Sequence, residues 1–126
     1  MPTFSKTSEQ KLATCHQDLM VIFSNVIKIT DCSVICGHRG KKEQNAAFDK
    51  GFSMLKYPQS KHNKTPSMAV DVVPYPIDWS DEKRFRELAG IVKGVAFMLK
   101  SYGAIEHDII CGADWTNFRD YPHYQI

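Results

Sequence analysis

Two segments of this chain repeat apolar side chains at steps of three and four residues, which is the spacing of one face of a helix. The first is predicted as a single helix from a cap at Thr7 or Ser8 to about Ile29, and the second spans 81–101 and ends before Gly103. Their apolar positions are Leu12, Cys15, Leu19, Ile22, Phe23 and Val26, and then Phe85, Leu88, Ile91, Val92, Val95 and Leu99. A helix with one apolar face must bury that face, so the rest of the chain has to provide a surface for both helices.

Short runs of β-branched and apolar residues predict that this surface is a sheet. The predicted strands are 34–37, 68–73, 104–111 and 121–126, and a further helix is predicted over 41–52. Asp78 or Ser80 is the expected cap of the long later helix. The last two strands are close enough in sequence to pair antiparallel. We therefore expect an α+β fold, a small, mainly antiparallel sheet with helices packed on it, formed by a single domain over residues 1–126.

The composition is that of an ordinary soluble globular protein, with 43% hydrophobic and 24% charged residues. A net charge of +2 is too small to indicate a nucleic-acid-binding protein. No apolar run approaches the roughly 18 residues of a membrane span, and no apolar leader follows Met1. We expect a monomer that is made in the cytoplasm and has no nucleic-acid partner and no stable membrane association.

The four cysteines admit two interpretations. Cys32 and Cys36 bracket an apolar run and Cys111 follows another, which favours buried thiols. A zinc site made of all four, with Cys15, is the alternative, although no second close pair accompanies Cys32 and Cys36. Disulfides are not expected in a cytoplasmic chain of this size.

Two histidines and an aspartate stand out as candidate ligands of a catalytic metal ion. His62 lies in a long polar loop, Asp71 lies on the strand after it, and His123 lies on the last predicted strand. Two imidazoles and one carboxylate suit a catalytic Zn²⁺, with a further position left open for water. Asp120, three residues before His123, can transfer protons there only if it lies on a turn, because residues three apart in a strand face opposite sides.

The alternative for His62 and His123 is that both are ordinary surface histidines, since the chain also contains His16, His38 and His107. The ordered set with two aspartates favours the metal. His38 adjoins Arg39 and is a candidate for a further ligand or a substrate contact, but an exposed surface position is favoured for it. His107, beside two acidic residues, is predicted to lie on a solvated face.

Four motifs, in this order, resemble those of the bacteriophage endolysins of the L-alanyl-D-glutamate peptidase family, which are D-alanyl-D-alanine carboxypeptidase-like zinc peptidases. The motifs are Ser60-Lys61-His62, Ala69-Val70-Asp71, Gly112-Ala113-Asp114-Trp115 and Asp120-Tyr121-Pro122-His123-Tyr124. The resemblance covers most of the chain and implies a DD-peptidase/Hedgehog-like zinc fold with Zn²⁺ as the cofactor. The loop between His62 and Asp71 is longer than is usual in that family, and Ser67 stands where a glycine would align. The shape of the substrate cleft is therefore expected to differ.

The resemblance also implies a role for each site residue. The zinc ligands would be His62, Asp71 and His123, and the catalytic base would be Asp120. Arg39 would hold the substrate carbonyl as negative charge develops there, and Ser60 would support the site by hydrogen bonding. Trp115, which the residue pattern alone leaves as either a core residue or a cleft wall, would support the site or bind substrate.

The function that the resemblance implies is that of a zinc-dependent peptidoglycan hydrolase, an endolysin that cleaves the L-alanyl-D-glutamate bond of the peptide stem. The alternatives are a D-alanyl-D-alanine carboxypeptidase with the same zinc site and a binding module that keeps zinc without hydrolysis. No separate cell-wall-binding domain is expected. Such an enzyme would stay in the host cytoplasm until lysis, cross the inner membrane with the help of a separate holin, and act on the cell wall in the periplasm.

Overall fold

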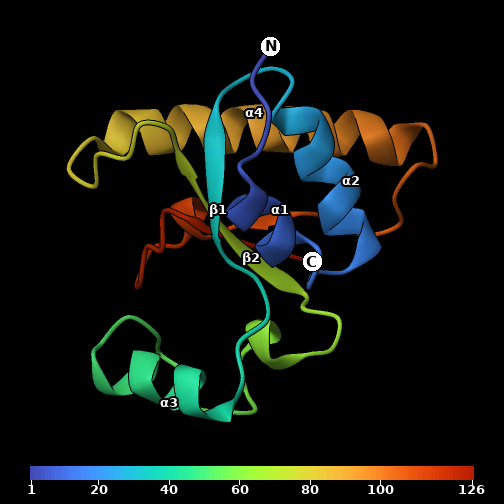
Figure 1. Ribbon diagram of the computed structural model, residues 1–126. Coiled ribbons are helices and arrows are strands. Elements are labelled where there is room, and N and C mark those ends of the chain that lie inside the picture. The colour runs from blue at the N-terminus through green and yellow to red at the C-terminus, as the bar shows by residue number, and fades with distance from the viewer.

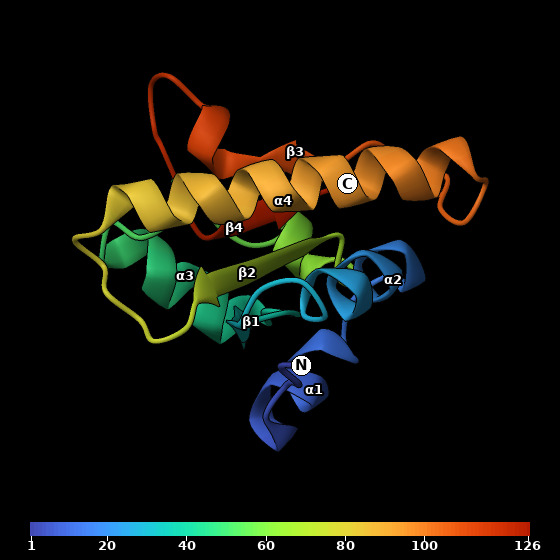
Figure 2. The same cartoon turned by 90° about the horizontal axis from the view of Figure 1, so that it is seen from above.

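A four-stranded antiparallel sheet forms the centre of the computed structural model, which describes residues 1–126. Its strands are β1 (Cys32–Cys36), β2 (Ala69–Pro74), β3 (Ile110–Cys111) and β4 (His123–Gln125). They lie side by side in the order β1-β2-β4-β3, which can be followed in Figure 2. The predicted α+β fold with a small, mainly antiparallel sheet is therefore confirmed.

Four helices and two short 3₁₀ segments surround the sheet. The helices are α1 (Lys6–Leu12), α2 (Gln17–Val26), α3 (Lys41–Asp49) and α4 (Glu82–Ser101), and the 3₁₀ segments are η1 (Lys61–Asn63) and η2 (Gly112–Asp114). The long helix α4 runs across one end of the molecule near α2, whereas α3 lies at the opposite end (Figure 1). Asp81 caps α4, and not the expected Asp78 or Ser80, because the carboxylate of Asp78 is already bound to Ser80. None of these helices combines the length and the apolar character that a membrane crossing needs.

The apolar faces of α2 and α4 pack on one face of the sheet and form the core with it. The buried side chains of these helices include Leu19, Ile22, Phe23, Val26, Leu88, Ala89, Val92 and Ala96. Val70 and Val72 of β2 and Tyr124 of β4 belong to the same cluster. Because successive residues of a strand face opposite sides, Asp71 and His123 face away from this core. The alternation therefore leaves the other face of the sheet for polar groups.

The cap of the first predicted helix is Ser5 and not Thr7 or Ser8. The Ser8 hydroxyl instead accepts a hydrogen bond from the N–H of Val34 at 3.0 Å, so it is engaged by β1.

The first predicted helix is also not continuous, because residues 13–16 break it into α1 and α2. The backbone of the break pairs with a distant residue: the N–H of His16 donates to the Ser67 carbonyl at 2.8 Å, and the N–H of Ser67 donates to the Thr14 carbonyl at 3.0 Å. Gly37 packs so closely against Thr14 that a side chain at this position would collide with it. The apolar period continues across the break, so periodicity alone does not reveal it.

The strand predicted over 104–111 is also wrong, because only Ile110–Cys111 pairs in the sheet. The backbone N–H groups of Glu106 and His107 donate instead to the carboxylate of Asp18, at 3.0 and 3.1 Å. His107 Nδ1 lies 2.7 Å from the same oxygen. His107 is therefore half-buried against α2 and does not lie on a solvated face. Asp18 fastens the loop that follows α4 to the start of α2.

The end of α3 and the arrangement of the cysteines also differ from what the sequence predicts. The helix predicted to reach residue 52 ends at Asp49, because Gly51 adopts a φ of 78°, a left-handed conformation that stops a helix. The four cysteines are free thiols; Cys36 is half-buried and the buried ones are Cys15, Cys32 and Cys111. They do not form one metal site. Only one group of candidate metal ligands includes a cysteine, and Cys36 is the only cysteine in it.

Replacing Asp18 with asparagine is expected to lower the free energy of unfolding by about 1–3 kcal/mol at neutral pH, because three donors lose a charged acceptor. Burial disfavours the ionised carboxylate, but hydrogen bonds from His107 and Glu106 outweigh this effect and lower the pKa of Asp18. A depressed pKa in the folded state stabilises the protein above the unfolded pKa of about 3.9, and this stabilisation is lost as the pH falls through the folded value. Urea unfolding at neutral pH and near pH ~3 should therefore show a gap between the two proteins that narrows in acid.

Asp108→Asn is the matched control, because Asp108 is exposed and pairs only with Lys100 at the surface. Its loss is expected to cost less than about 1 kcal/mol. An equal cost for the two substitutions would contradict the role given to Asp18.

Candidate active site

Asp71 of β2 occupies the centre of the sheet face that the helices leave free. Its partners on the neighbouring strands are Cys36 of β1 and His123 of β4. A bulge between Val34 and Cys36 shifts the register of β1 by one residue, so that Cys36 and not Ile35 stands opposite Asp71. Three polar side chains therefore lie in one row across the sheet.

His62 reaches Asp71 from η1, the 3₁₀ turn in the long loop before β2. The Ser60 hydroxyl caps this turn by accepting a hydrogen bond from the N–H of His62 at 3.2 Å. His62 Nδ1 lies 2.7 Å from the Gly37 carbonyl oxygen, and since a carbonyl can only accept, Nδ1 carries the proton. The other ring nitrogen, Nε2, lies 3.2 Å from Asp71 Oδ1. The imidazole is almost completely buried, so its orientation is set by these contacts.

The extra length of the loop between His62 and Asp71 does not separate the two side chains. Residues 64–66 are exposed and bulge outward, while the N–H of Met68 donates to the Lys61 carbonyl at 3.0 Å across the base of the loop. Ser67 is buried, and its hydroxyl donates to the Ala69 carbonyl at 2.6 Å. The loop is therefore closed at its base by the residues on either side of the bulge.

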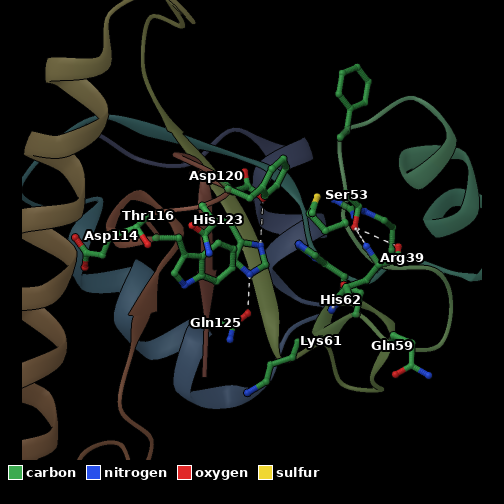
Figure 3. Close-up of a pocket in the computed structure, with 17 residues that line it drawn as sticks. Arg39, Ser53, Gln59, Lys61, His62, Asp114, Thr116, Asp120, His123 and Gln125 are labelled. Atoms are coloured by element: carbon green, nitrogen blue, oxygen red, sulfur yellow. Dashed lines mark hydrogen bonds and ion pairs between the residues drawn. The ribbon is translucent and has the colours of Figure 1, made fainter.

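His123 of β4 presents its Nδ1 to the same oxygen of Asp71, at 3.3 Å. Its Nε2 lies 2.9 Å from the side-chain oxygen of Gln125, which is two residues further along the strand and on the same face. Figure 3 shows the His123 ring between Asp120 and Gln125. The centroids of the His62 and His123 rings are 5.2 Å apart. The structure thus brings the three expected ligands together around one carboxylate oxygen.

Asp120 lies on a turn just before β4. The N–H of His123 donates to the Asp120 carbonyl at 3.0 Å, and the N–H of Asp120 donates to the Gly112 carbonyl at 3.2 Å. This turn brings Asp120 Oδ2 to 3.9 Å from His123 Nδ1, which a regular strand would not allow. Burial, together with the negative charge of Asp71, raises the pKa of Asp120 to about 6.

Arg39 lies on the other side of Asp71 and is held in place from several directions. Its guanidinium donates to Asp71 Oδ2 at 3.2 Å and to Gln44 Oε1 at 3.1 Å. Its backbone N–H donates to the His62 carbonyl at 2.8 Å. Gln44 is completely buried, and its amide nitrogen donates to the Leu55 carbonyl at 2.7 Å. Arg39 is therefore a fixed cation in the wall of the site.

Opposite charges balance each other at the centre of the site. Burial disfavours ionisation of Asp71, but hydrogen bonds from His123 and His62 outweigh this effect and hold its pKa well below the usual range. Burial also disfavours the protonated form of His62, but its hydrogen bond to Asp71 outweighs this effect and raises the pKa of His62 to about 9. A buried carboxylate in such a place needs a compensating positive charge, which either a proton or a metal ion can supply.

The donor set fits a divalent metal ion of the zinc type, because two imidazole nitrogens converge with a carboxylate oxygen. Asp71 belongs to two groups whose ligand atoms all lie within 4.8 Å of one another, one with Cys36 and His62 and the other with Asp120 and His123. Cys36 Sγ lies 4.0 Å from His62 Nδ1, the ring nitrogen that does not face Asp71. Cys36 therefore contacts the protonated side of the imidazole and not the side where the other donors meet.

A cavity of about 670 Å³ opens beside these groups (Figure 3). One wall is formed by residues 52–55 and 59–62, and the opposite wall by residues 114–118. Trp115 is part of the second wall, with its ring centroid 5.1 Å from that of His123, and it does not belong to the core cluster. Of the two interpretations of Trp115, the structure places it in the cleft wall.

The remaining histidines lie outside this site. His38 is exposed, its Nε2 lies 3.4 Å from the Thr65 hydroxyl, and it does not line the cavity. His38 is therefore neither a ligand nor a cavity contact. His16 and His107 form a separate group with Asp18, in which His16 caps α2 and His107 helps to hold the loop after α4.

Three residues of the site were missed by sequence reasoning. Cys36 reaches Asp71 only because of the bulge in β1, which no motif announces. Gln44 fixes Arg39 from α3, and nothing in the spacing of the two residues indicates that contact. The contact of Gln125 with His123 could have been predicted, because Gln125 follows His123 by two residues on a predicted strand and therefore lies on the same face of the sheet.

Comparison with known proteins agrees with this geometry. A family model described as phage L-alanyl-D-glutamate peptidase matches residues 2–125 of the chain. Among solved structures, the fold is similar to that of the L-Ala D-Glu endopeptidase ChiX of Serratia marcescens, with a TM-score of 0.77. The two sequences are 25% identical, and the match covers 98% of this chain and 90% of that chain. No curated protein sequence matches the chain.

Gly112 is expected to tolerate no side chain. A Cβ at this position would collide with the Asp120 carbonyl and would lie 3.0 Å from the Cβ of His123. Gly112→Ala is therefore expected to lower the free energy of unfolding by about 1–3 kcal/mol, because backbone and not a flexible side chain has to move. Urea unfolding measures the change.

Gly90→Ala provides the control, because Gly90 lies on the exposed side of α4 with nothing within 4 Å of an added Cβ. This substitution is expected to stabilise the protein by about 0.5–1 kcal/mol through helix propensity. A similar increase in the free energy of unfolding for Gly112→Ala would show that the turn before β4 can accommodate a Cβ, and would contradict the prediction.

Proposed function

The chain belongs to the phage L-alanyl-D-glutamate peptidase family and is a peptidase, and from this we propose that it is a zinc-dependent endolysin acting on the peptide stem of bacterial peptidoglycan. The bond that we propose it hydrolyses joins L-alanine to D-glutamate. The observation that carries the zinc proposal is the approach of two imidazole nitrogens to one oxygen of Asp71, at 3.2 and 3.3 Å. Such an arrangement in a cavity wall is suited to a catalytic metal with an open position.

We assign His62 Nε2, an Asp71 oxygen and His123 Nδ1 as the metal ligands. In support of this, the other ring nitrogen of each histidine is engaged, by the Gly37 carbonyl and by Gln125. Histidine ligands are commonly oriented in this way by a group that binds their second nitrogen. When bound, zinc would polarise the scissile carbonyl and lower the pKa of a bound water.

Asp120 and Arg39 supply the chemistry that belongs to the protein itself. We propose that Asp120 accepts a proton from the attacking water and passes it to the nitrogen of the leaving amine, because its carboxylate borders the ligands and lines the cavity. Arg39 would stabilise the negative charge that develops on the carbonyl oxygen. Its guanidinium is already fixed by Gln44, so little reorganisation is needed when that charge forms.

The shape of the cleft favours an endopeptidase over a D-alanyl-D-alanine carboxypeptidase. The cavity of about 670 Å³ and a second cavity of about 620 Å³ both have Arg39 and Asp120 in their lining. A substrate chain can therefore extend on both sides of the reacting groups, whereas a carboxypeptidase has to hold only one residue beyond the scissile bond. A binding module that holds zinc without hydrolysis would not need Arg39 and Asp120 beside the proposed metal ligands.

The proposed setting follows from the substrate. The protein would remain in the host cytoplasm until lysis, depend on a separate holin for release, and reach the wall from the periplasmic side. We propose that it acts as a monomer, with residues 1–126 forming one catalytic domain.

Removal of the metal tests the proposal. Treatment with a chelator is expected to abolish lysis of outer-membrane-permeabilised Gram-negative cells, and added Zn²⁺ is expected to restore it. His123→Ala should lower kcat/KM on purified stem peptides at least ~100-fold and should not recover with Zn²⁺. His38→Ala is the matched control, because it removes an exposed histidine outside the site and should retain activity.

Mass spectrometry of the digested stem peptides identifies the bond. The expected products separate after L-alanine, with D-glutamate at the new amino terminus. Release of free D-alanine instead would identify a carboxypeptidase, and full activity after metal removal would refute the zinc site.

A further inference from the structure

A second cavity continues the cleft on the far side of Arg39 and Asp120. It has a volume of about 620 Å³ and shares Arg39, Phe52, Phe118 and Asp120 with the first cavity. The two cavities therefore adjoin at the reacting groups, and we describe them as the two arms of one cleft. The proposed function lets the substrate extend into both cavities but does not assign the second cavity to any particular part of the substrate.

Three of the aromatic residues that line this second cavity do not line the first, and we call these three, Trp79, Phe85 and Tyr121, the aromatic shelf. The rings of Trp79 and Phe85 stack with their centroids 5.6 Å apart and an interplanar angle of 25°. The rings of Phe85 and Tyr121 are 6.1 Å apart. Phe85 is buried, whereas Trp79 is 60% exposed. Stacking on a buried ring holds the indole at a defined angle and leaves much of it available to a ligand.

The two arms of the cleft differ in polarity. Most residues that line the first arm are not hydrophobic, among them Ser60, Gln125 and the cation Lys61, although Trp115 also forms part of its wall. Most residues that line the second arm are hydrophobic and include the aromatic shelf, although the cation Arg119 is also part of its lining. The substrate has the same asymmetry about the L-alanyl-D-glutamate bond. Its carboxyl-terminal side carries the carboxylates of D-glutamate and of the residues that follow. On its amino-terminal side, one uncharged alanine links the bond to the lactyl group of a muramic acid sugar.

We propose that the aromatic shelf binds the pyranose ring of the muramic acid residue that carries the stem peptide. This inference rests on the proposed function, because it takes the direction of the substrate from the bond that is cut. One face of a pyranose presents C–H groups, whose positive polarisation matches the negative face of an aromatic ring. Arg119, in the lining of the same cavity, offers donors for the sugar's oxygen atoms. The enzyme would thus recognise the glycan as well as the peptide.

The test compares two substrates that differ only in the sugar. One is the disaccharide-linked stem peptide, and the other is the same peptide with an N-acetyl group, which keeps the amino end uncharged. Trp79→Ala is expected to lower kcat/KM for the sugar-linked substrate about tenfold, mainly through KM, and to change the value for the N-acetylated peptide less than about twofold. Trp79→Phe, which keeps an aromatic face, should retain most of the preference. Phe97→Ala removes an exposed aromatic residue elsewhere on α4 and should change neither value.

Equal losses on the two substrates, or no loss on either, would overturn the sugar site and leave the proposed peptidase function intact. A wild-type protein that cleaves neither substrate after L-alanine would instead refute the proposed function. These two failures are therefore distinguishable in one set of assays.

A second inference concerns Gln125 and comes from the ring nitrogens of His123. The Nε2 of His123 lies 2.9 Å from Gln125 Oε1, and its Nδ1 lies 3.3 Å from Asp71 Oδ1. An amide oxygen only accepts, so in the neutral imidazole, the form that binds a metal, this contact places the proton on Nε2 and leaves the lone pair on Nδ1, the nitrogen that faces the other proposed ligands. Gln125 performs for His123 the task that the Gly37 carbonyl performs for His62.

We infer that Gln125 is a positioning residue that sets the tautomer and the angle of His123 for metal binding. This inference, too, depends on the zinc site of the proposed function. Zn²⁺ affinity, measured by competition with a chromophoric chelator, is the readout. Gln125→Ala is expected to weaken Zn²⁺ binding about 10–100-fold, whereas Gln125→Glu, which keeps an acceptor, should bind within about threefold of the wild type.

Gln59→Ala is the control, since Gln59 lines the same cavity and is not among the hydrogen-bond partners of the His62 and His123 rings. Unchanged affinity in Gln125→Ala, or equal weakening in Gln125→Glu, would refute the positioning role. A wild-type protein that binds no Zn²⁺ would refute the zinc site itself.

Discussion

The buried carboxylate of Asp71 is the group on which the organisation of the site depends. An isolated negative charge at the middle of a sheet would be very costly to bury, so the fold has to surround it with positive charge or hydrogen-bond donors. It does so from three directions, with His62 from η1, His123 from β4 and Arg39 from the segment after β1. Loss of any one of these partners leaves the charge less compensated, and the side chains around Asp71 therefore form a mutually dependent set.

The parts of the fold that depend on local periodicity could be predicted, and the parts that depend on distant contacts could not. Both ends of the long helix α4 lie within one residue of the prediction, because its apolar face and the glycine after it are local signals. The break between α1 and α2 has no such signal, since it is made by backbone pairing with Ser67, which is remote in sequence. The shortening of β3 has the same kind of cause, because Asp18 captures the backbone N–H groups of Glu106 and His107.

The same distinction applies to the candidate site. The order of the motifs was sufficient to predict that His62, Asp71 and His123 meet, because a strand pair and a loop junction can bring such positions together. Their supports could not be predicted as well. Cys36 depends on a bulge, and a carbonyl such as that of Gly37 leaves no trace in a sequence pattern. The residues that perform the chemistry are thus easier to read from a sequence than the groups that orient them.

Gly37 connects the site to a part of the chain that contains none of the proposed catalytic groups. Its carbonyl holds the imidazole of His62, while its α-carbon packs against Thr14 at the junction of α1 and α2. The amino-terminal helices are therefore a structural support of the reaction centre and not a detachable leader. An engineer who grafts this domain into a chimeric lysin should set the fusion point ahead of Ser5, the cap of α1, and leave everything after it untouched.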